Sequence, residues 1–243
     1  MFAERVLLAL VGAVTVMTSQ AAAQTADDVN ARCVNADRSF SREEQVLACT
    51  RQLAIPGRTV EQQAYTHNNR GNAFRANREY GAAIADYDEA IRLNPNYENA
   101  YNNRGIANRA AGLPDRAIAD FDAALRINPV LANAYGNRGS AHADRGDLNR
   151  AIADWTRAVE LDPNNSSAYN NRGNAYRQRR EYDRAIADFS EAVRINPRYA
   201  VAFNNRGRTY QEMGDMARAM ADFEQARQIE PEDPAFQGFG LRR

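Results

Sequence analysis

The chain has 243 residues, enough for one or two domains with a sizeable core. Its 31 basic residues, all arginine, balance 31 acidic residues, so the formal net charge is zero. A balanced, dispersed charge argues against binding of nucleic acid or of an anionic membrane surface, because both require a basic face.

Residues 1–23 have the features of an export signal. Arg5 is followed by an apolar run from Val6 to Val16, and residues 21–23 are three alanines that offer a cleavage site. The run has about half of the roughly 20 residues that a membrane-spanning helix needs. We therefore predict a signal peptide, export to a bacterial periplasm (secretion is the alternative) and no membrane insertion after cleavage. An uncleaved anchor is the competing interpretation.

The next segment, residues 24–63, contains both cysteines of the chain, Cys33 and Cys49. An even number of cysteines in an exported protein favours a disulfide, and a reactive thiol pair is the competing idea. Ser41 and Glu44 have the spacing of a capping box, which predicts that a helix begins directly after Ser41.

A period of 34 residues organises the chain from residue 64 to residue 233. The tripeptide Asn-Arg-Gly recurs at this interval, ending at Gly71, Gly105, Gly139, Gly173 and Gly207. The period defines five units: 64–97, 98–131, 132–165, 166–199 and 200–233. Regular repeats of this length indicate stacked units that bury a continuous core between neighbours.

Each unit has the pattern of two helices. In the third unit, residues from Ala132 to Arg145 have small or apolar side chains at helical spacing, Gly146 interrupts them, and the pattern resumes from Leu148 to Leu161. Pro163 ends the second helix, because proline disfavours helix at the residue before it.

Small residues at positions 8, 20 and 27 of each unit, an aromatic at 24 and proline at 32 resemble the tetratricopeptide repeat. The resemblance runs from Ala64 to about Asp233 and implies an all-α solenoid of stacked helical hairpins that winds into a right-handed superhelix. Position 7 departs from the family, because arginine replaces leucine at Arg70, Arg104, Arg138, Arg172 and Arg206. Aspartate accompanies each one at position 23: Asp86, Asp120, Asp154, Asp188 and Asp222. We predict Arg–Asp pairs between helices, with ligand contact by the arginines as the alternative.

The resemblance also suggests how the two ends are capped. It makes residues 24–63 a degenerate hairpin in which Cys33 and Cys49 occupy positions that touch in the family's fold, so it implies a disulfide between them. Position 28, apolar in the first four units, is Arg227 in the last, as expected where no further unit covers it. The tail, residues 234–243, contains Phe236 and Phe239 and is too short for a capping helix.

In this family the first helix of each unit lines the inner wall, and here that wall is predicted to be rich in amides. Position 6 is always asparagine, position 5 is asparagine except at Gly136, and position 12 is arginine in three units. The predicted binding residues are Asn69, Asn103, Asn137, Asn171 and Asn205; Asn68, Asn102, Asn170 and Asn204; and Arg75, Arg109 and Arg177. An asparagine amide can pair with both groups of a peptide bond. First helices about 8–10 Å apart would present one asparagine to about every third residue of an extended peptide.

This pattern resembles the asparagine ladder in the repeat domain of O-linked N-acetylglucosamine transferase. The alternative is that the asparagines merely cap or solvate their helices. Asparagine is a mediocre helix former, however, so its recurrence within helices favours a binding role.

No arrangement of residues points to catalysis, a metal or a cofactor. His67 and His142 fall at packing positions, the acidic residues recur with the repeat, and the glycines form no phosphate loop. We predict a non-catalytic scaffold or adaptor that holds an extended segment of a protein partner on its concave face, with no small-molecule substrate. The alternative is a structural solenoid that self-assembles through its outer face or C-terminal end. The absence of lysine excludes the carboxylate-clamp repeats, which grip acidic chaperone tails with lysines.

Overall fold

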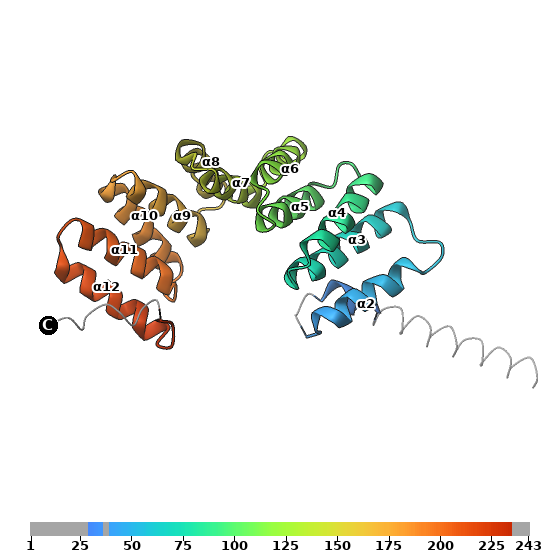
Figure 1. Cartoon of the computed structure of the whole chain (residues 1–243), viewed down its shortest axis with the longest axis horizontal. Coiled ribbons are helices and arrows are strands. Elements are labelled where there is room, and N and C mark those ends of the chain that lie inside the picture. Colours follow the sequence, from blue (N-terminus) through green and yellow to red (C-terminus); the bar gives the residue numbers. More distant parts are fainter. Residues whose placement is uncertain (1–28, 36–38, 235–243) are drawn as a thin grey trace, which may run out of the picture. The chain divides into compact units, whose positions relative to one another are not determined.

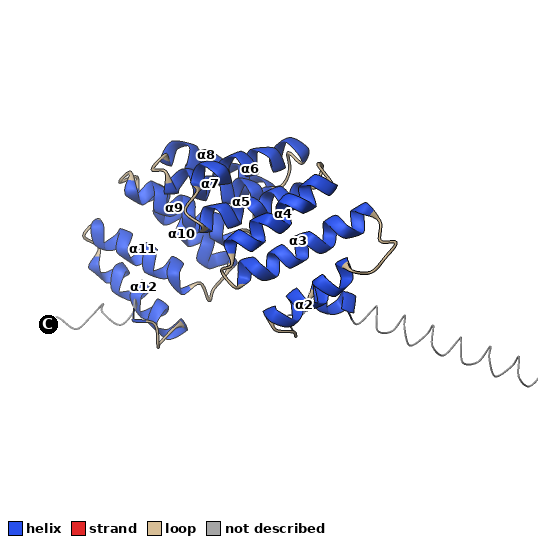
Figure 2. Cartoon of the chain, turned by 45° about the vertical axis from the view of Figure 1, so that its right-hand side comes forward, coloured by secondary structure: helices blue, strands red, loops and turns tan. Residues whose placement is uncertain are grey.

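The computed structural model describes residues 29–35 and 39–234 and divides the chain into two compact units, Met1–Ala111 and Gly112–Arg243. The predicted signal peptide and the two phenylalanines of the tail lie outside the described residues. All regular elements within the described ranges are helices (Figures 1 and 2). The boundary between the units falls inside the second predicted repeat.

The first unit begins with a short helical segment, residues 29–34. It continues with α2 (Arg42–Leu53), α3 (Val60–Ala76), α4 (Tyr80–Leu93) and α5 (Glu98–Ala110). Each of these helices packs against the next along the chain, and α3 also contacts α5. The unit is therefore a stack of helical hairpins in which first helices lie beside first helices.

The second unit repeats the same arrangement. Its helices are α6 (Pro114–Ile127), α7 (Ala132–Asp144), α8 (Leu148–Leu161), α9 (Ser166–Gln178), α10 (Tyr182–Ile195), α11 (Ala200–Glu212) and α12 (Met216–Ile229). The pairs α7–α8, α9–α10 and α11–α12 form the hairpins, and α9 contacts both α7 and α11. The predicted all-α fold of stacked hairpins is confirmed within each unit. In the third repeat, α8 has the predicted bounds and α7 ends one residue before the predicted Arg145.

Position 8 needs glycine in four of the repeats, at Gly71, Gly139, Gly173 and Gly207, because an aromatic side chain lies directly against it. A Cβ atom at Gly71 would approach Tyr87 Cε1 to 2.7 Å, and one at Gly173 would approach Phe189 Cε1 to 2.8 Å. Tyr87 and Phe189 have no exposed surface. The small residues therefore allow the paired helices to close around one large ring, as the sequence predicts.

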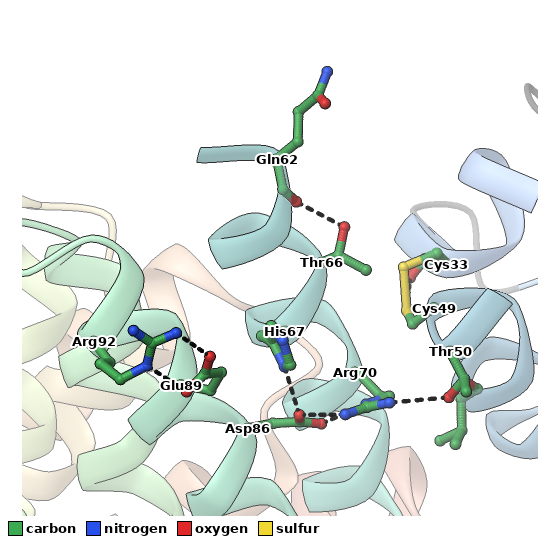
Figure 3. Close-up of polar contacts among 11 residues, drawn as sticks. Cys33, Cys49, Thr50, Gln62, Thr66, His67, Arg70, Asp86, Glu89 and Arg92 are labelled. Carbon is green, nitrogen blue, oxygen red and sulfur yellow. Dashed lines mark hydrogen bonds and ion pairs between the residues drawn. A yellow bond between two sulfur atoms is a disulfide. The ribbon is translucent and has the colours of Figure 1, made fainter. Parts of the chain in front are cut away.

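Four of the five predicted Arg–Asp pairs are observed within hairpins. Arg70 Nε donates to Asp86 Oδ2 at 2.8 Å and Nη2 donates to Oδ1 at 2.7 Å (Figure 3). Equivalent two-point pairs form at Arg138–Asp154, Arg172–Asp188 and Arg206–Asp222. Because each aspartate is largely buried, the arginine neutralises a charge that would otherwise be costly.

The same arginines make a second contact that the sequence analysis missed. Nη1 of Arg70 donates to Thr50 Oγ1 on α2 at 3.1 Å, and Nη1 of Arg104 donates to Asp88 Oδ1 on α4 at 2.6 Å. The acceptor is the residue at position 25 of the preceding hairpin, which is Thr50, Asp88, Asp122, Thr156 or Ser190. Each position-7 arginine thus links its own hairpin to the preceding one within a unit.

The N-terminal hairpin differs from the repeats in two ways. Cys33 and Cys49, both buried, have Cα atoms 4.7 Å apart, and their sulfur atoms lie at bonding distance, 2.14 Å (Figure 3). The predicted capping box is present at the start of α2: Glu44 N–H donates to Ser41 Oγ, and Ser41 N–H donates to a carboxylate oxygen of Glu44.

The second difference is the start of α3. This helix begins at Val60, four residues before the predicted start of the first repeat, and a capping box between Thr59 and Gln62 fixes its first turn. Residues 54–59 connect α2 to α3, whereas residues 94–97 suffice between α4 and α5. The joint between the hairpin and the first repeat is therefore longer than the joints between repeats.

Among the described residues, no helix is both long and apolar enough to cross a bilayer. The same residues bring together no group of three or more His, Cys, Asp or Glu side chains that could hold a metal ion.

Candidate functional site

The position-5 asparagines lie between neighbouring helices with little exposure. Asn68, Asn102, Asn170 and Asn204 are 3–6% exposed. In the third repeat, where Gly136 takes this position, its carbonyl accepts a hydrogen bond from Trp155 Nε1 at 3.1 Å. The predicted binding residues at position 5 are therefore largely covered in this structure.

Two of the position-6 asparagines, Asn103 and Asn205, bridge consecutive first helices. Asn103 Nδ2 donates to Asn68 Oδ1 at 2.9 Å in the first unit. In the second unit, Asn205 Nδ2 donates to Asn170 Oδ1 at the same distance. Each bridge joins position 6 of one repeat to position 5 of the repeat before it. These two asparagines thus link neighbouring repeats through amide bridges.

The asparagines at positions 5 and 6 form a row along the first helices. At each end of this row, one amide atom has no hydrogen-bond partner among the described residues. Asn69 Nδ2 is one of them. The asparagine that corresponds to Asn68 in the N-terminal hairpin is Asn30, whose Oδ1 instead accepts from Gln52 Nε2 at 3.2 Å. The other atom is Asn204 Oδ1, which belongs to the last repeat and so has no following asparagine to donate to it.

The middle of the row is more accessible than position 5. Asn103, Asn137 and Asn171 are half-buried, whereas Asn69 and Asn205, at 8% and 9% exposure, are nearly covered. A bridge uses one of the two amide hydrogens of a position-6 asparagine. In Asn103 this leaves the second hydrogen and the oxygen for a peptide group, whereas the oxygen of Asn171 accepts from Asn170 Nδ2 at 3.4 Å.

The three position-12 arginines have different surroundings. Arg177 Nη1 donates to Glu212 Oε1 on the following first helix at 2.6 Å, and its buried Nε has no hydrogen-bond partner among the described residues. Arg75 is half-buried beside the Tyr87 hydroxyl. Arg109 is exposed at the end of α5. Part of this predicted cationic row therefore serves contacts between and within repeats.

A polar group that the sequence analysis missed lies beside Arg75. The Tyr87 hydroxyl donates to Asn72 Oδ1 at 2.9 Å, and burial raises the pKa of Tyr87 to about 12, so the hydroxyl remains a donor. Asn72 occupies position 9, which the family places on the inner wall. The signal was available in the sequence, because tyrosine replaces the phenylalanine or tryptophan of the other repeats at this buried position.

One of the two histidines, His67, pairs with an aspartate, and the other, His142, is buried. His67 Nδ1 lies 2.9 Å from Asp86 Oδ1 (Figure 3). Burial acts to raise the pKa of Asp86, but hydrogen bonds from Arg70 and His67 outweigh it, so the pKa lies below its usual value. His142 is buried, and burial lowers the pKa of its imidazole.

Similar solved structures share this architecture. MamA is 26% identical over 66% of this chain and 94% of its own, with a TM-score of 0.60. YrrB, described as a tetratricopeptide repeat protein with an unusual peptide-binding site, is 24% identical over 79% of this chain and 96% of its own, with a TM-score of 0.59. PilF of Pseudomonas aeruginosa is 17% identical over 89% of this chain and 97% of its own, with a TM-score of 0.73.

Comparison of the sequence with known families agrees with the fold. No curated protein sequence matches the chain significantly. Family profiles described as tetratricopeptide repeat match residues 64–97, 98–130, 137–200 and 200–233. The matches at 64–97 and 200–233 coincide with 34-residue units, and together the matches cover most of the described residues. The chain belongs to the tetratricopeptide repeat family.

Proposed function

We propose that this protein is a non-catalytic scaffold that holds an extended segment of a partner protein along its position-6 asparagines. Tetratricopeptide repeat folds bind protein or peptide partners, and a peptide-binding site on this fold is named for YrrB. The observation that carries the proposal is the inter-repeat amide bridge. It orients a half-buried amide on a first helix and leaves that amide able to pair with a peptide backbone.

The position-5 asparagines have a supporting role in this proposal. Asn68 and Asn170 accept the bridges and hold the next asparagine in a fixed rotamer. Preorganised groups bind at a lower entropic cost than mobile ones. Because the amides would read backbone groups, binding would depend weakly on the partner's sequence. Arg75, Arg109 and Arg177 would add contacts at the margin of the same surface.

The experiment is capture of partners from native envelope extract with the wild-type protein and a triple variant. Asn103→Ala, Asn137→Ala and Asn171→Ala change the three half-buried members of the row. The matched control is Arg92→Ala, Arg126→Ala and Arg194→Ala, which changes three exposed residues at position 29 of the second helices. Loss of capture by the asparagine variant alone, with helical content unchanged by circular dichroism, is the expected result. Equal capture by all three proteins would contradict the proposal.

The export of the chain and the oxidation of its cysteines belong to the same proposal. A fusion of residues 1–23 to a reporter enzyme that is active only outside the cytoplasm should give activity. The placement of Cys33 and Cys49 at bonding distance supports a disulfide, whose closure of a loop of about 15 residues is worth roughly 3 kcal/mol. Mass measurement after non-reducing alkylation should find no alkylated thiol, and two labelled thiols would refute the disulfide.

A specific surface favours the alternative of self-assembly. Met213, Met216 and Met220, around the last hairpin, are 44%, 50% and 57% exposed. Exposed apolar side chains in one region are a feature of protein–protein contacts. Sedimentation of the wild-type protein, of the Met216→Gln, Met220→Gln variant and of a chain that ends at Phe236 distinguishes the two functions. An oligomer that these changes dissociate, combined with unimpaired capture by the asparagine variant, would favour the structural role.

A further inference from the structure

A cleft of about 810 Å³ lies in the first unit, where the N-terminal hairpin meets the first repeat. Its walls come from the hairpin, from the connection between α2 and α3, from the first turns of α3 and from the connection between α4 and α5. The lining residues are Asn30, Gln52, Ile55, Arg58, Glu61, Gln62, Tyr65, Asn94 and Tyr97. Its volume falls within the range of about 300–1,000 Å³ that is typical of small-ligand sites.

The longer joint between the hairpin and the first repeat supplies much of this wall. Residues 54–59 connect α2 to α3, and the extra first turn of α3 brings Glu61 and Gln62 to the cleft. Arg58 Nη2 donates to Thr66 Oγ1 at 2.9 Å and to the Gln62 carbonyl at 3.3 Å, which holds the connection against α3. The cleft is therefore formed by an ordered insertion relative to the 34-residue repeat.

Two polar atoms of the lining residues are buried and have no hydrogen-bond partner among the described residues. One is the acceptor Gln52 Oε1, on a residue that is only 2% exposed. The other is the donor Arg58 Nε. A buried polar group without a partner is destabilising, so a ligand that pairs with it gains affinity. The residues that line the cleft therefore include one with an unmet acceptor and one with an unmet donor.

The remaining lining groups define the chemistry of the ligand. The charges of Arg58 and Glu61 offset each other, so neither an anion nor a cation is favoured. Tyr65, which is 46% exposed, and the half-buried Tyr97 provide aromatic surface, and Ile55 adds an aliphatic side chain. A neutral group with both a donor and an acceptor, next to an apolar side chain, matches this lining.

We propose that the cleft binds a short, uncharged peptide segment of a partner protein that carries an aromatic or aliphatic residue. A backbone N–H of the segment would donate to Gln52 Oε1, Arg58 Nε would donate to a backbone carbonyl, and the apolar side chain would pack against Tyr65 and Tyr97. This site goes beyond the proposed function, because it uses none of the repeat asparagines. It would anchor one point of a partner in a side-chain-specific way.

The probe is the blocked tripeptide N-acetyl-Ala-Phe-Ala-amide with a fluorinated ring, and its binding to the purified protein is measured by fluorine NMR titration. Gln52→Leu should weaken binding by about three- to tenfold, the usual effect of losing one hydrogen bond. A depsipeptide, in which an ester oxygen replaces the phenylalanine N–H, should weaken binding to the wild-type protein by a similar factor and have no further effect in Gln52→Leu.

A second variant keeps the test decisive if Gln52→Leu does not fold. Tyr65→Ala should reduce affinity at least about fivefold, since it removes an exposed aromatic wall. Val201→Ala, at the equivalent position of the fifth repeat and 43% exposed, should leave affinity unchanged. The triple asparagine variant should also bind the probe normally, so failure of the repeat surface and failure of the cleft are distinguishable.

Two results would overturn the proposal. One is that the wild-type, Gln52→Leu and Tyr65→Ala proteins show the same affinity, including none. The other is that a synthetic peptide of residues 232–243 displaces the probe and that deleting those residues strengthens probe binding. The cleft would then be occupied by the chain's own C-terminal tail and not by a partner.

Discussion

Arg172 donates two parallel hydrogen bonds to Asp188, from Nε to Oδ2 at 2.8 Å and from Nη2 to Oδ1 at 2.7 Å. The same guanidinium uses Nη1 to reach Thr156 Oγ1 at 3.1 Å, on the second helix of the preceding repeat. Its plane also lies near the Tyr169 ring, 5.5 Å from the ring centroid. One side chain thus joins three helices, and a family position that is ordinarily leucine has become a polar link.

The first prediction concerns this link. Arg172→Ala should lower the free energy of unfolding by about 3 kcal/mol, because it leaves the Asp188 carboxylate buried without its partner. Urea unfolding followed by circular dichroism measures the change. Arg194→Ala is the matched control, because Arg194 pairs with Glu191 on an exposed helix face and its loss should leave the midpoint almost unmoved. Similar midpoints for the two variants would show that the link contributes little.

The repeat pattern predicted these pairs because both partners recur at fixed positions of every unit. The contact to position 25 of the preceding hairpin was missed, because its acceptor varies in type among Thr50, Asp88 and Ser190 and only the shared oxygen is constant. The asparagine bridges were missed for another reason. Their partners lie 35 residues apart, and a pattern that looks within one repeat does not connect position 6 to position 5 of the repeat before.

Departures from the period were harder to predict than the period itself. The spacing of Ser41 and Glu44 predicts their capping box, whereas the same spacing at Thr59 and Gln62 lies before Ala64, where the period places the start of the first repeat. That extra turn forms part of the cleft wall. The cleft itself requires side chains from several segments to meet in space, which no local pattern in the sequence specifies.

The second prediction tests the glycine at position 8. Gly173→Ala should destabilise the protein by about 1–3 kcal/mol, since the new Cβ would lie 2.8 Å from the Phe189 ring in a packed core. Gly136→Ala should instead stabilise it by about 0.5–1 kcal/mol, because the nearest atom, Ala158 Cβ, is 4.0 Å away and alanine favours helix. Urea denaturation of both variants gives the comparison. Loss of stability in both would mean that close approach to the aromatic ring is not the cause.

The third prediction is a pH dependence at His142. Burial lowers the pKa of its imidazole from the usual 6.5, while Asp154 opposes this shift and Arg138 assists it. The unfolded chain therefore binds the proton more readily than the folded chain. The stability contributed by the neutral ring is fully present above pH 6.5 and is lost as the pH falls below that value.

His142→Tyr, which introduces the residue that Tyr176 and Tyr210 provide at the same position of the fourth and fifth repeats, tests that expectation. The free energy of unfolding in urea is measured above and below pH 6.5. It should fall less for the variant than for the wild-type protein when the pH is lowered below 6.5. The lowered pKa of Asp86 acts in a different range, below about pH 4, because its contribution is lost only as that carboxylate takes up a proton. Parallel pH profiles for the two proteins would contradict the role of His142.

The fourth prediction concerns the turn between the helices of each hairpin. Position 15 has a left-handed backbone, with φ of +78° at Gly112, +80° at Gly146 and +85° at Gly214, but arginine occupies it at Arg78 and Arg180. A side chain in this region costs about 1–2 kcal/mol, only part of which is offset by the greater freedom of glycine in the unfolded chain. Arg180→Gly should therefore raise the free energy of unfolding by about 0.5–1 kcal/mol.

Gln178→Gly provides the comparison for this turn. Gln178 is exposed and ends α9 with helical geometry, so glycine there adds unfolded-state entropy and relieves no strain. In thermal unfolding, Arg180→Gly should have a higher melting temperature than the wild-type protein, and Gln178→Gly should have a lower one. Both substitutions could instead lower the melting temperature. The stabilisation from the Arg180 guanidinium would then exceed the free-energy cost of its left-handed backbone, and strain at position 15 would not limit the stability of that hairpin.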